Sequence, residues 1–137
     1  MKNILITGCN GYIGSCISAY LKKNFFIIGI DKKKKSQNKH INVKYNLNLN
    51  NFKILKSKLN KHKIDLIIHL AGESTLDNIK NQNDYYVNNV LATKNLIKIS
   101  NQLKINNIIF SSTAAVYAGG LKLLSEKSKI KPQNVYG

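Results

Sequence analysis

The first fourteen residues constrain the fold of this chain more than any other stretch. A short apolar run, Ile4 to Ile6, opens the sequence, and glycines follow at positions 8, 11 and 14. A continuous apolar run is typical of a strand buried on both faces of a sheet. A strand followed at once by spaced glycines predicts a sharp turn that leads into a helix.

The glycine spacing indicates an anion site. Gly8 permits the tight turn, Gly11 leaves room for a diphosphate beside the backbone, and Gly14 lets the helix pack closely on the strand. The helix then begins near Gly11 or Tyr12 and points unbonded N–H groups at the loop. The spacing is one residue longer than the familiar dinucleotide fingerprint. A structural glycine turn without a ligand is the alternative.

An acidic residue ends the second apolar run, because Phe25 to Ile30 is followed by Asp31. A carboxylate at the end of this strand accepts hydrogen bonds from an adenosine ribose and repels the 2′-phosphate of NADP, so Asp31 favours NAD. A solvated strand-end aspartate is the alternative. The lysines at 32–35 either soften that repulsion or form a solvated loop.

The rest of the chain predicts three more strands, around 41–45 near the sheet edge, 64–70 and 108–110, and helices over 12–23, 49–61 and 83–104. Alternating strands and helices predict an α/β fold, a Rossmann-type doubly wound parallel sheet with helices on both faces. Ligands bind beyond the carboxyl ends of such strands, where Gly8, Asp31, Ala71, Gly72 and Thr113 fall. The 137 residues support one domain, 1–137.

The net charge of +16 results from 22 basic and 6 acidic residues, and the basic ones are all lysine and spread along the whole chain. Abundant lysine, asparagine and isoleucine are typical of an AT-rich genome. Because arginine is the residue expected where phosphates or bases are gripped bidentately, we expect no specific nucleic-acid partner.

The two cysteines, Cys9 and Cys16, have no metal-binding spacing, and no metal is expected. No apolar run approaches the roughly 20 residues that span a bilayer, so no membrane association is expected. The chain opens directly on a core strand, and we expect a cytoplasmic location. His69, in an apolar strand, is interpreted as a buried hydrogen-bonded residue rather than a catalyst, and Tyr85, Tyr86 and Tyr117 as packing residues.

Together these blocks resemble the extended short-chain dehydrogenase/reductases, the NAD-dependent epimerase/dehydratase family, and among them most closely the UDP-glucose 4-epimerases. The resemblance covers the whole chain and rests on five blocks in order, which are 7–14 with Asp31, 65–72, 85–90, 110–117 and the closing Tyr136–Gly137.

The resemblance implies a set of site residues. Thr113 would hydrogen-bond the sugar hydroxyl that is oxidised, and Tyr136 would be the catalytic base. Asn88 and Asn89 are alternatives for one cofactor-binding asparagine, and both are kept. The cofactor-binding residues implied for NAD are Gly8, Gly11, Tyr12, Ile13, Gly14, Asp31, Asn46, Leu47, Leu70, Ala71, Gly72, Asn88 and Asn89.

The implied activity is nucleotide-sugar epimerisation, most similar to interconversion of UDP-glucose and UDP-galactose through a 4-keto intermediate. A phenol is a weak base at neutral pH and needs positive charge nearby, which this family supplies from the nicotinamide and from a lysine four residues after the tyrosine. That lysine, at position 140, and the family's substrate domain would follow Gly137. We therefore expect this chain alone to be an N-terminal fragment with little turnover, and a full-length form to be a homodimer.

Two alternatives remain open at the sequence level. One is a nucleotide-sugar 4,6-dehydratase or a reductase of the same superfamily, although dehydratases generally have an acidic pair where Ala114 and Ala115 stand. The other is a non-catalytic NAD-binding remnant. The sequence departs from the family at Asn46, where an aspartate is usual near the adenine, and at Ala92, where glycine is common.

Overall fold

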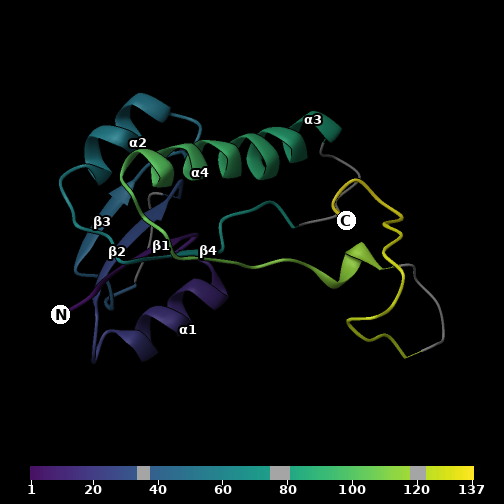
Figure 1. Cartoon of the computed structure of the whole chain (residues 1–137), viewed down its shortest axis with the longest axis horizontal. Helices are drawn as coiled ribbons and strands as arrows, with labels where there is room; N and C mark the ends of the chain where they lie inside the picture. The colour runs from purple at the N-terminus through teal and green to yellow at the C-terminus, as the bar shows by residue number, and fades with distance from the viewer. Residues whose placement is uncertain (34–37, 75–80, 118–122) are drawn as a thin grey trace.

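A computed structural model of the chain describes residues 1–33, 38–74, 81–117 and 123–137. Five parallel strands form one sheet in the order β3-β2-β1-β4-β5. Figure 1 labels the first four of these, β3, β2, β1 and β4. The order confirms the predicted doubly wound sheet and the edge position of the third strand. The strands are β1 (Asn3–Thr7), β2 (Phe26–Asp31), β3 (Val43–Asn46), β4 (Leu66–His69) and β5 (Ile108–Phe110).

Helices cover both faces of the sheet, as predicted. Helix α1 (Tyr12–Leu21) lies on one face, and α2 (Phe52–Leu59) and α4 (Ala92–Gln102) lie on the other (Figure 1). The predicted long helix is present, since α3 (Gln82–Tyr85) and a π-helical segment, η1 (Tyr86–Leu91), run directly into α4. A short 3-10 turn, η2 (Ala114–Val116), follows β5.

The regular alternation of strand and helix fails at one connection. Between β2 and β3 the described residues, 32, 33 and 38–42, contain no helix. Only eleven positions separate Asp31 from Val43, fewer than the dozen or more of a helical crossover. Lys34 and Lys35, of the lysine run, lie outside the described residues.

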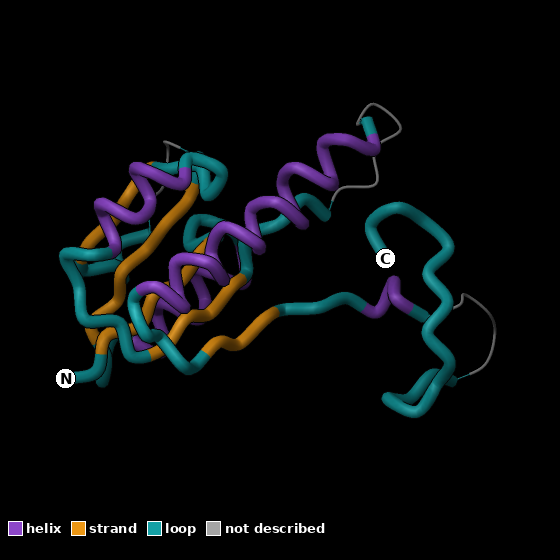
Figure 2. The backbone as a smooth tube through the Cα atoms, turned by 45° about the horizontal axis from the view of Figure 1, so that its top comes forward, coloured by secondary structure: helices purple, strands orange, loops and turns teal. Residues whose placement is uncertain are grey.

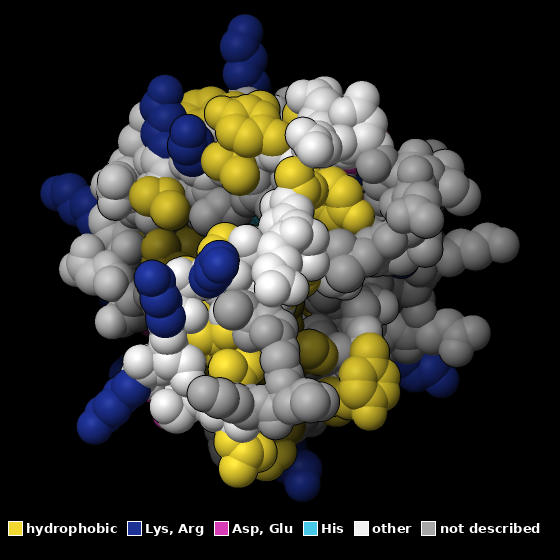
Figure 3. Space-filling model, turned by 90° about the vertical axis from the view of Figure 1, so that its right-hand side faces the viewer, with side chains coloured by type: hydrophobic (Ala, Val, Ile, Leu, Met, Phe, Trp, Pro, Cys, Tyr) yellow, Lys and Arg dark blue, Asp and Glu magenta, His cyan; other side chains and the backbone are white. Residues whose placement is uncertain are grey.

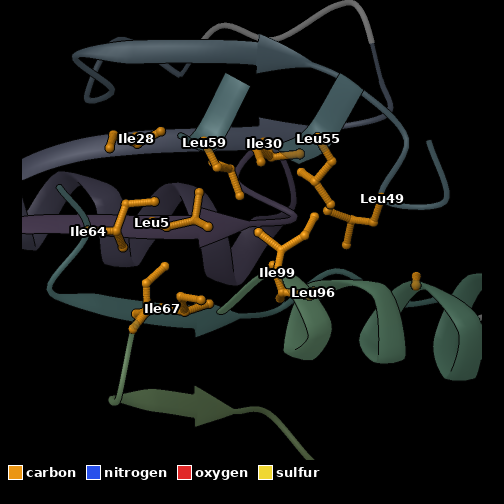
Figure 4. Packing of buried hydrophobic residues seen from close by; sticks show 12 residues of the cluster. Leu5, Ile28, Ile30, Leu49, Leu55, Leu59, Ile64, Ile67, Leu96 and Ile99 are labelled. Carbon is orange, nitrogen blue, oxygen red and sulfur yellow. The ribbon is translucent and has the colours of Figure 1, made fainter. Parts of the chain in front are cut away.

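The larger hydrophobic core fills the space between the sheet and the pair α2 and α4. Figure 4 shows strand residues such as Leu5 and Ile67 pointing toward Leu55, Leu59 and Leu96 of the helices. These five side chains are at most 1% exposed. On the opposite face a smaller cluster, which includes Ile4, Ile6 and Ile27, packs under α1.

The last strand is more exposed than any other described strand. Ile108, Ile109 and Phe110 are 40%, 54% and 57% exposed, although their apolar run resembles those of the buried strands. β5 pairs only with β4 among the described strands. Beyond β5 the chain runs away from the sheet as an extended segment (Figure 2).

The C-terminal segment presents apolar side chains to solvent. Figure 3 shows hydrophobic side chains at several places on this end of the molecule, with lysines around them. Leu123, Ile130 and Val135 are 101%, 68% and 50% exposed. No helix among the described residues has both the length and the apolar character needed to cross a bilayer.

We predict that Leu59→Ala lowers the free energy of unfolding by about 3 kcal/mol, because the fully buried Leu59 side chain fills the core between α2 and the sheet. Ile54→Ala on the same helix is the matched control, since Ile54 is 45% exposed and its loss should cost under about 1 kcal/mol. Urea unfolding followed by circular dichroism measures both. Equal losses would contradict this assignment of the core.

Candidate functional site

A cleft opens at the carboxyl ends of β1, β2 and β4, the edge that the sequence predicts for a ligand. It encloses about 150 Å³ and is open to solvent. Eight of the predicted cofactor-binding residues line it, together with six others. The predicted ones are Gly8, Gly11, Asp31, Leu47, Leu70, Ala71, Gly72 and Asn88, and the others are Ile30, Lys32, Lys33, Asn48, Leu49 and Ala92.

The glycine loop reaches its position because two of its residues have no side chain. Gly8 has φ +69°, and a Cβ there would lie 2.8 Å from the amide nitrogen of Ala71. A Cβ on Gly14 would collide with the carbonyl oxygen of Gly8. The loop therefore lies directly against the exit of β4, and helix α1 starts close to the end of β1.

The N-terminus of α1 leaves backbone donors available beside the cleft. Gly11 is the N-cap and provides no side-chain cap, and the first helical hydrogen bond is from Ser15 N to Gly11 O (2.9 Å). The amides of Tyr12, Ile13 and Gly14 precede that bond and have no intrahelical acceptor. The side chains of Tyr12 and Ile13 are exposed and do not line the cleft, so only their backbone amides suit an anion there.

Asp31 fixes the glycine loop and also faces the cleft. Its Oδ2 accepts from the amide of Asn10 and its Oδ1 from the amide of Lys33, both at 2.9 Å. A carboxylate has about four acceptor positions, so two remain for a ligand hydroxyl. Asp31 is only 9% exposed, which places its negative charge inside the cleft rather than in solvent.

Asn46 and Leu47, both predicted to bind the cofactor, lie differently with respect to the cleft. Leu47 lines the cleft, whereas Asn46 does not. The side-chain amide of Asn46 donates to the backbone oxygen of Asp31 (3.1 Å), so it supports the carboxylate-bearing strand end from outside the cleft.

The two candidate asparagines of η1 have different partners. Asn88 lines the cleft and accepts from Lys32 Nζ (3.3 Å). Asn89 instead holds the backbone after β4, because its Oδ1 accepts from the amide of Glu73 (2.6 Å) and its Nδ2 donates to the oxygen of Glu73 (3.0 Å). Lys32 also lies 3.8 Å from a carboxylate oxygen of Glu73, so it links β2 to the opposite wall.

Thr113 and Tyr136 lie away from this cleft, in the segment after β5. Thr113 Oγ1 accepts from the amide of Ala115 (3.1 Å) and so caps η2. The chain then returns to this turn, with Lys131 N bonded to Val116 O (2.9 Å). A Cβ on Gly137 would collide with the carbonyl oxygen of Ala115, so the residue after Tyr136 touches the turn that Thr113 begins.

His69 is buried and hydrogen-bonded, as its sequence context predicts. It is 2% exposed and bonds through both ring nitrogens to hydroxyl groups. Burial lowers the pKa of its imidazole to about 4. The interpretation of Tyr86 as a packing residue is wrong, because it is 48% exposed with Lys94 Nζ 6.0 Å from its ring centroid, whereas Tyr85 is buried.

Cys9 sits at the glycine loop but has no reactive thiol. Burial, and secondarily the nearby Asp31 carboxylate, raise the pKa of Cys9 to about 11, so it stays protonated at neutral pH. Among the described residues no group of three or more histidine, cysteine or acidic side chains is placed to hold a metal ion.

A sequence model of the NAD dependent epimerase/dehydratase family matches residues 4–137. The chain belongs to this family. Its members are NAD-dependent, and two observations fit that cofactor, the uncapped start of α1 for a diphosphate and the Asp31 carboxylate one strand away for a ribose.

The individual relatives include enzymes of both kinds in the family's name, a dehydratase and an epimerase. The chain is 34% identical to a dTDP-D-glucose 4,6-dehydratase of Dictyostelium discoideum, over 99% of the chain and 37% of that protein. It is 32% identical to a UDP-glucose 4-epimerase of Halalkalibacterium halodurans, over 98% of the chain and 42% of that protein. The chain thus spans less than half the length of these relatives.

Solved structures give the same result for the fold. The UDP-Glc/GlcNAc 4-epimerase of Campylobacter jejuni superposes with a TM-score of 0.87 at 32% identity, and the match covers 100% of this chain and 45% of that one. A second UDP-glucose 4-epimerase gives a TM-score of 0.89 at 28% identity, over 98% and 43% of the two chains.

We predict that the protein loses stability in mild acid because of His69. The unfolded chain binds a proton at this histidine below about pH 6.5, whereas the folded chain resists it down to about pH 4. The stabilisation is therefore complete above pH 6.5 and is lost as the pH falls toward 4. Between pH 7.5 and 5 the loss is on the order of 2 kcal/mol.

Urea unfolding at a series of pH values from 7.5 to 5 measures this loss, above the range in which most carboxylates titrate. His69→Asn should flatten the pH dependence. His40→Gln, at an exposed histidine, should leave it unchanged. A flat profile for the unaltered chain would show that His69 is not held neutral by the fold.

Proposed function

We propose that this chain is the cofactor-binding part of an NAD-dependent nucleotide-sugar epimerase, most similar in activity to UDP-glucose 4-epimerase. The observation that favours this activity within the family is the turn after β5. There a capping hydroxyl, Thr113, is followed in the sequence by Ala114 and Ala115, where dehydratases of this family generally have an acidic pair.

Different residues of the cleft would bind different parts of NAD. The amides of Tyr12, Ile13 and Gly14 would hold the diphosphate, Asp31 the adenosine ribose, and the Leu70–Gly72 backbone the flat side of the dinucleotide. Absent side chains at Gly8, Gly11 and Gly72 let a ligand approach the backbone. Asn46 and Asn89, which were also expected to bind NAD, would act on it through Asp31 and Glu73 respectively.

Bound NAD supplies the reversible hydride transfer that converts the sugar C4 alcohol to a ketone and back. Tyr136 would remove the proton from the C4 hydroxyl and later return it, and the Thr113 hydroxyl would orient the same oxygen. The return of the chain to the η2 turn supports this pairing, since residues 23 positions apart are brought to one loop cluster.

A 4,6-dehydratase is the second candidate, and the 34% identity to the Dictyostelium discoideum enzyme favours it. An enzyme of that class must remove a proton and a hydroxyl group at neighbouring carbons, which requires a further acid and base. Within the described residues the nearest acidic side chain along the chain after Thr113 is Glu126, which is exposed. The turn composition therefore favours epimerisation.

The proposal also covers the substrate, metabolic role, oligomeric state and location of the full-length protein. A UDP-hexose is the proposed substrate, and galactose metabolism the proposed role. A homodimer in the cytoplasm is the proposed state, and the unpaired cysteines Cys9 and Cys16 are compatible with a reducing compartment.

The protein encoded by the complete reading frame, incubated with NAD and UDP-glucose, should form UDP-galactose, which chromatography separates from its epimer. We predict that Tyr136→Phe lowers the rate at least hundredfold, because it removes the base. Tyr20→Phe, on the exposed face of α1, should have no effect. A 4-keto-6-deoxy product would instead identify a dehydratase, and NAD binding with no product from any UDP- or dTDP-hexose would indicate a non-catalytic module.

We predict that Asp31→Asn weakens NAD binding about tenfold or more, because the charged acceptor for the ribose is lost. Glu126→Gln makes the same charge change at an exposed site and should bind NAD like the unaltered chain. Calorimetric titration with NAD and with NADP measures both variants. Equal weakening in the two variants would attribute the effect to net charge instead of the site.

A further inference from the structure

Three side chains from three elements meet beneath the wall of the cleft. Thr7 ends β1, His69 ends β4, and Thr93 lies in the first turn of α4. Thr7 Oγ1 is 2.6 Å from His69 Nδ1, and His69 Nε2 is 2.9 Å from Thr93 Oγ1. Thr7 and His69 are 0% and 2% exposed, so the bond between them is shielded from water, whereas the bond to the half-buried Thr93 is partly buried.

The hydrogen bonds link Thr7, His69 and Thr93 into a hydrogen-bonded chain of side chains, and the groups at its two ends determine where the protons lie. Thr93 Oγ1 lies 2.6 Å from the carbonyl oxygen of Asn89, which can only accept, so the Thr93 hydroxyl donates there. Thr93 must then accept from His69, which puts the imidazole proton on Nε2. Nδ1 consequently accepts from the Thr7 hydroxyl, whose oxygen in turn accepts from the amide of Ala71 (3.2 Å).

One end of this hydrogen-bonded chain lies in the wall of the cofactor cleft, and the other holds the backbone next to that wall. Ala71 lines the cleft, and its amide nitrogen is the atom that a Cβ on Gly8 would approach to 2.8 Å. Asn89 is the residue whose side chain holds the backbone of Glu73, next to Gly72 of the same wall. The His69 imidazole has one donor and one acceptor nitrogen, which point in opposite directions. Through Thr7 and Thr93 it therefore joins the end of β1 at the glycine loop, the β4 exit and η1.

We propose that His69 is a positioning residue for cofactor binding, a neutral Nε2–H imidazole that fixes the Ala71–Gly72 wall at the distance from Gly8 that the dinucleotide requires. Phe110 of β5 covers the ring, with centroids 5.6 Å apart. His69 itself does not line the cleft and acts through Thr7 and Thr93. The inference rests on the proposed cofactor site.

The role is specific to the hydrogen-bond pattern and separable from packing. Thr7→Val keeps the shape of the side chain but leaves the Ala71 amide and His69 Nδ1 without a partner, at a cost for buried polar groups. Thr7→Ser keeps the hydroxyl. Ser100→Ala is the matched control, because Ser100 is equally buried (1%) but bonds only locally, to Ile97 O (2.8 Å), at the far end of α4.

Calorimetric titration of NAD into the unaltered chain and the three variants tests the proposal. We expect Thr7→Val to weaken NAD binding at least tenfold, and Thr7→Ser and Ser100→Ala to stay within about threefold, with Ser100→Ala losing only stability. NAD binding by Thr7→Val within twofold of the unaltered chain would overturn the positioning role. No NAD binding by the unaltered chain would instead overturn the cofactor site on which it rests.

Nitrogen-15 NMR of the imidazole in the unaltered chain provides a second measurement if Thr7→Val does not fold. His69 should show a protonated Nε2 and an unprotonated Nδ1 at pH 7, and NAD should shift the Ala71 amide resonance. The opposite tautomer, or an Ala71 amide unmoved by saturating NAD, would overturn the proposal.

Discussion

The site depends on a close approach between two pieces of backbone, the turn at Gly8 and the exit of β4 at Leu70 and Ala71. With φ +69° and no Cβ, Gly8 lies so near that a methyl group would be 2.8 Å from Ala71 N. A parallel sheet brings its strand ends to one edge, but ordinary side chains would hold them apart there. The cleft exists because this contact is backbone to backbone.

The rest of the site is assembled around that contact by polar groups that satisfy one another. Asp31 ties β2 to the loop through Asn10, Asn46 supports Asp31 from the edge strand, and Asn89 holds the loop after β4. Such groups are costly to bury unless each finds a partner. In the described part of the chain no buried side-chain nitrogen or oxygen lacks one.

The sequence predicts the backbone of this site better than its side chains. Apolar runs and glycine spacing locate β1, α1 and β2, and Asp31 follows from its place at a strand end. The division of labour between Asn88 and Asn89 has no such local signal, because the π-helical segment changes the angle between successive side chains. The direction of Asn46 depends on a carbonyl 15 positions earlier in the chain.

The sequence predicts the last strand correctly but does not reveal its exposure. Ile108 to Phe110 has the composition of a buried strand, but burial depends on neighbours that periodicity does not reveal. In this chain β5 pairs on one side only among the described strands, and its three residues are between 40% and 57% exposed. Composition thus indicates what a strand is suited to pack against, while the topology decides what it meets.

The segment after β5 is attached to the molecule in a way that bears on how such proteins diversify. Among the described residues, its backbone hydrogen bonds lie within the segment, as from Lys131 N to Val116 O and from Tyr117 N to Ala114 O, except that Ser111 N donates to His69 O where the segment leaves β5. None of these bonds reaches the glycine loop. Sequence changes in this segment beyond Ser111 can therefore alter the proposed sugar-binding end while the hydrogen bonds of the glycine loop stay in place.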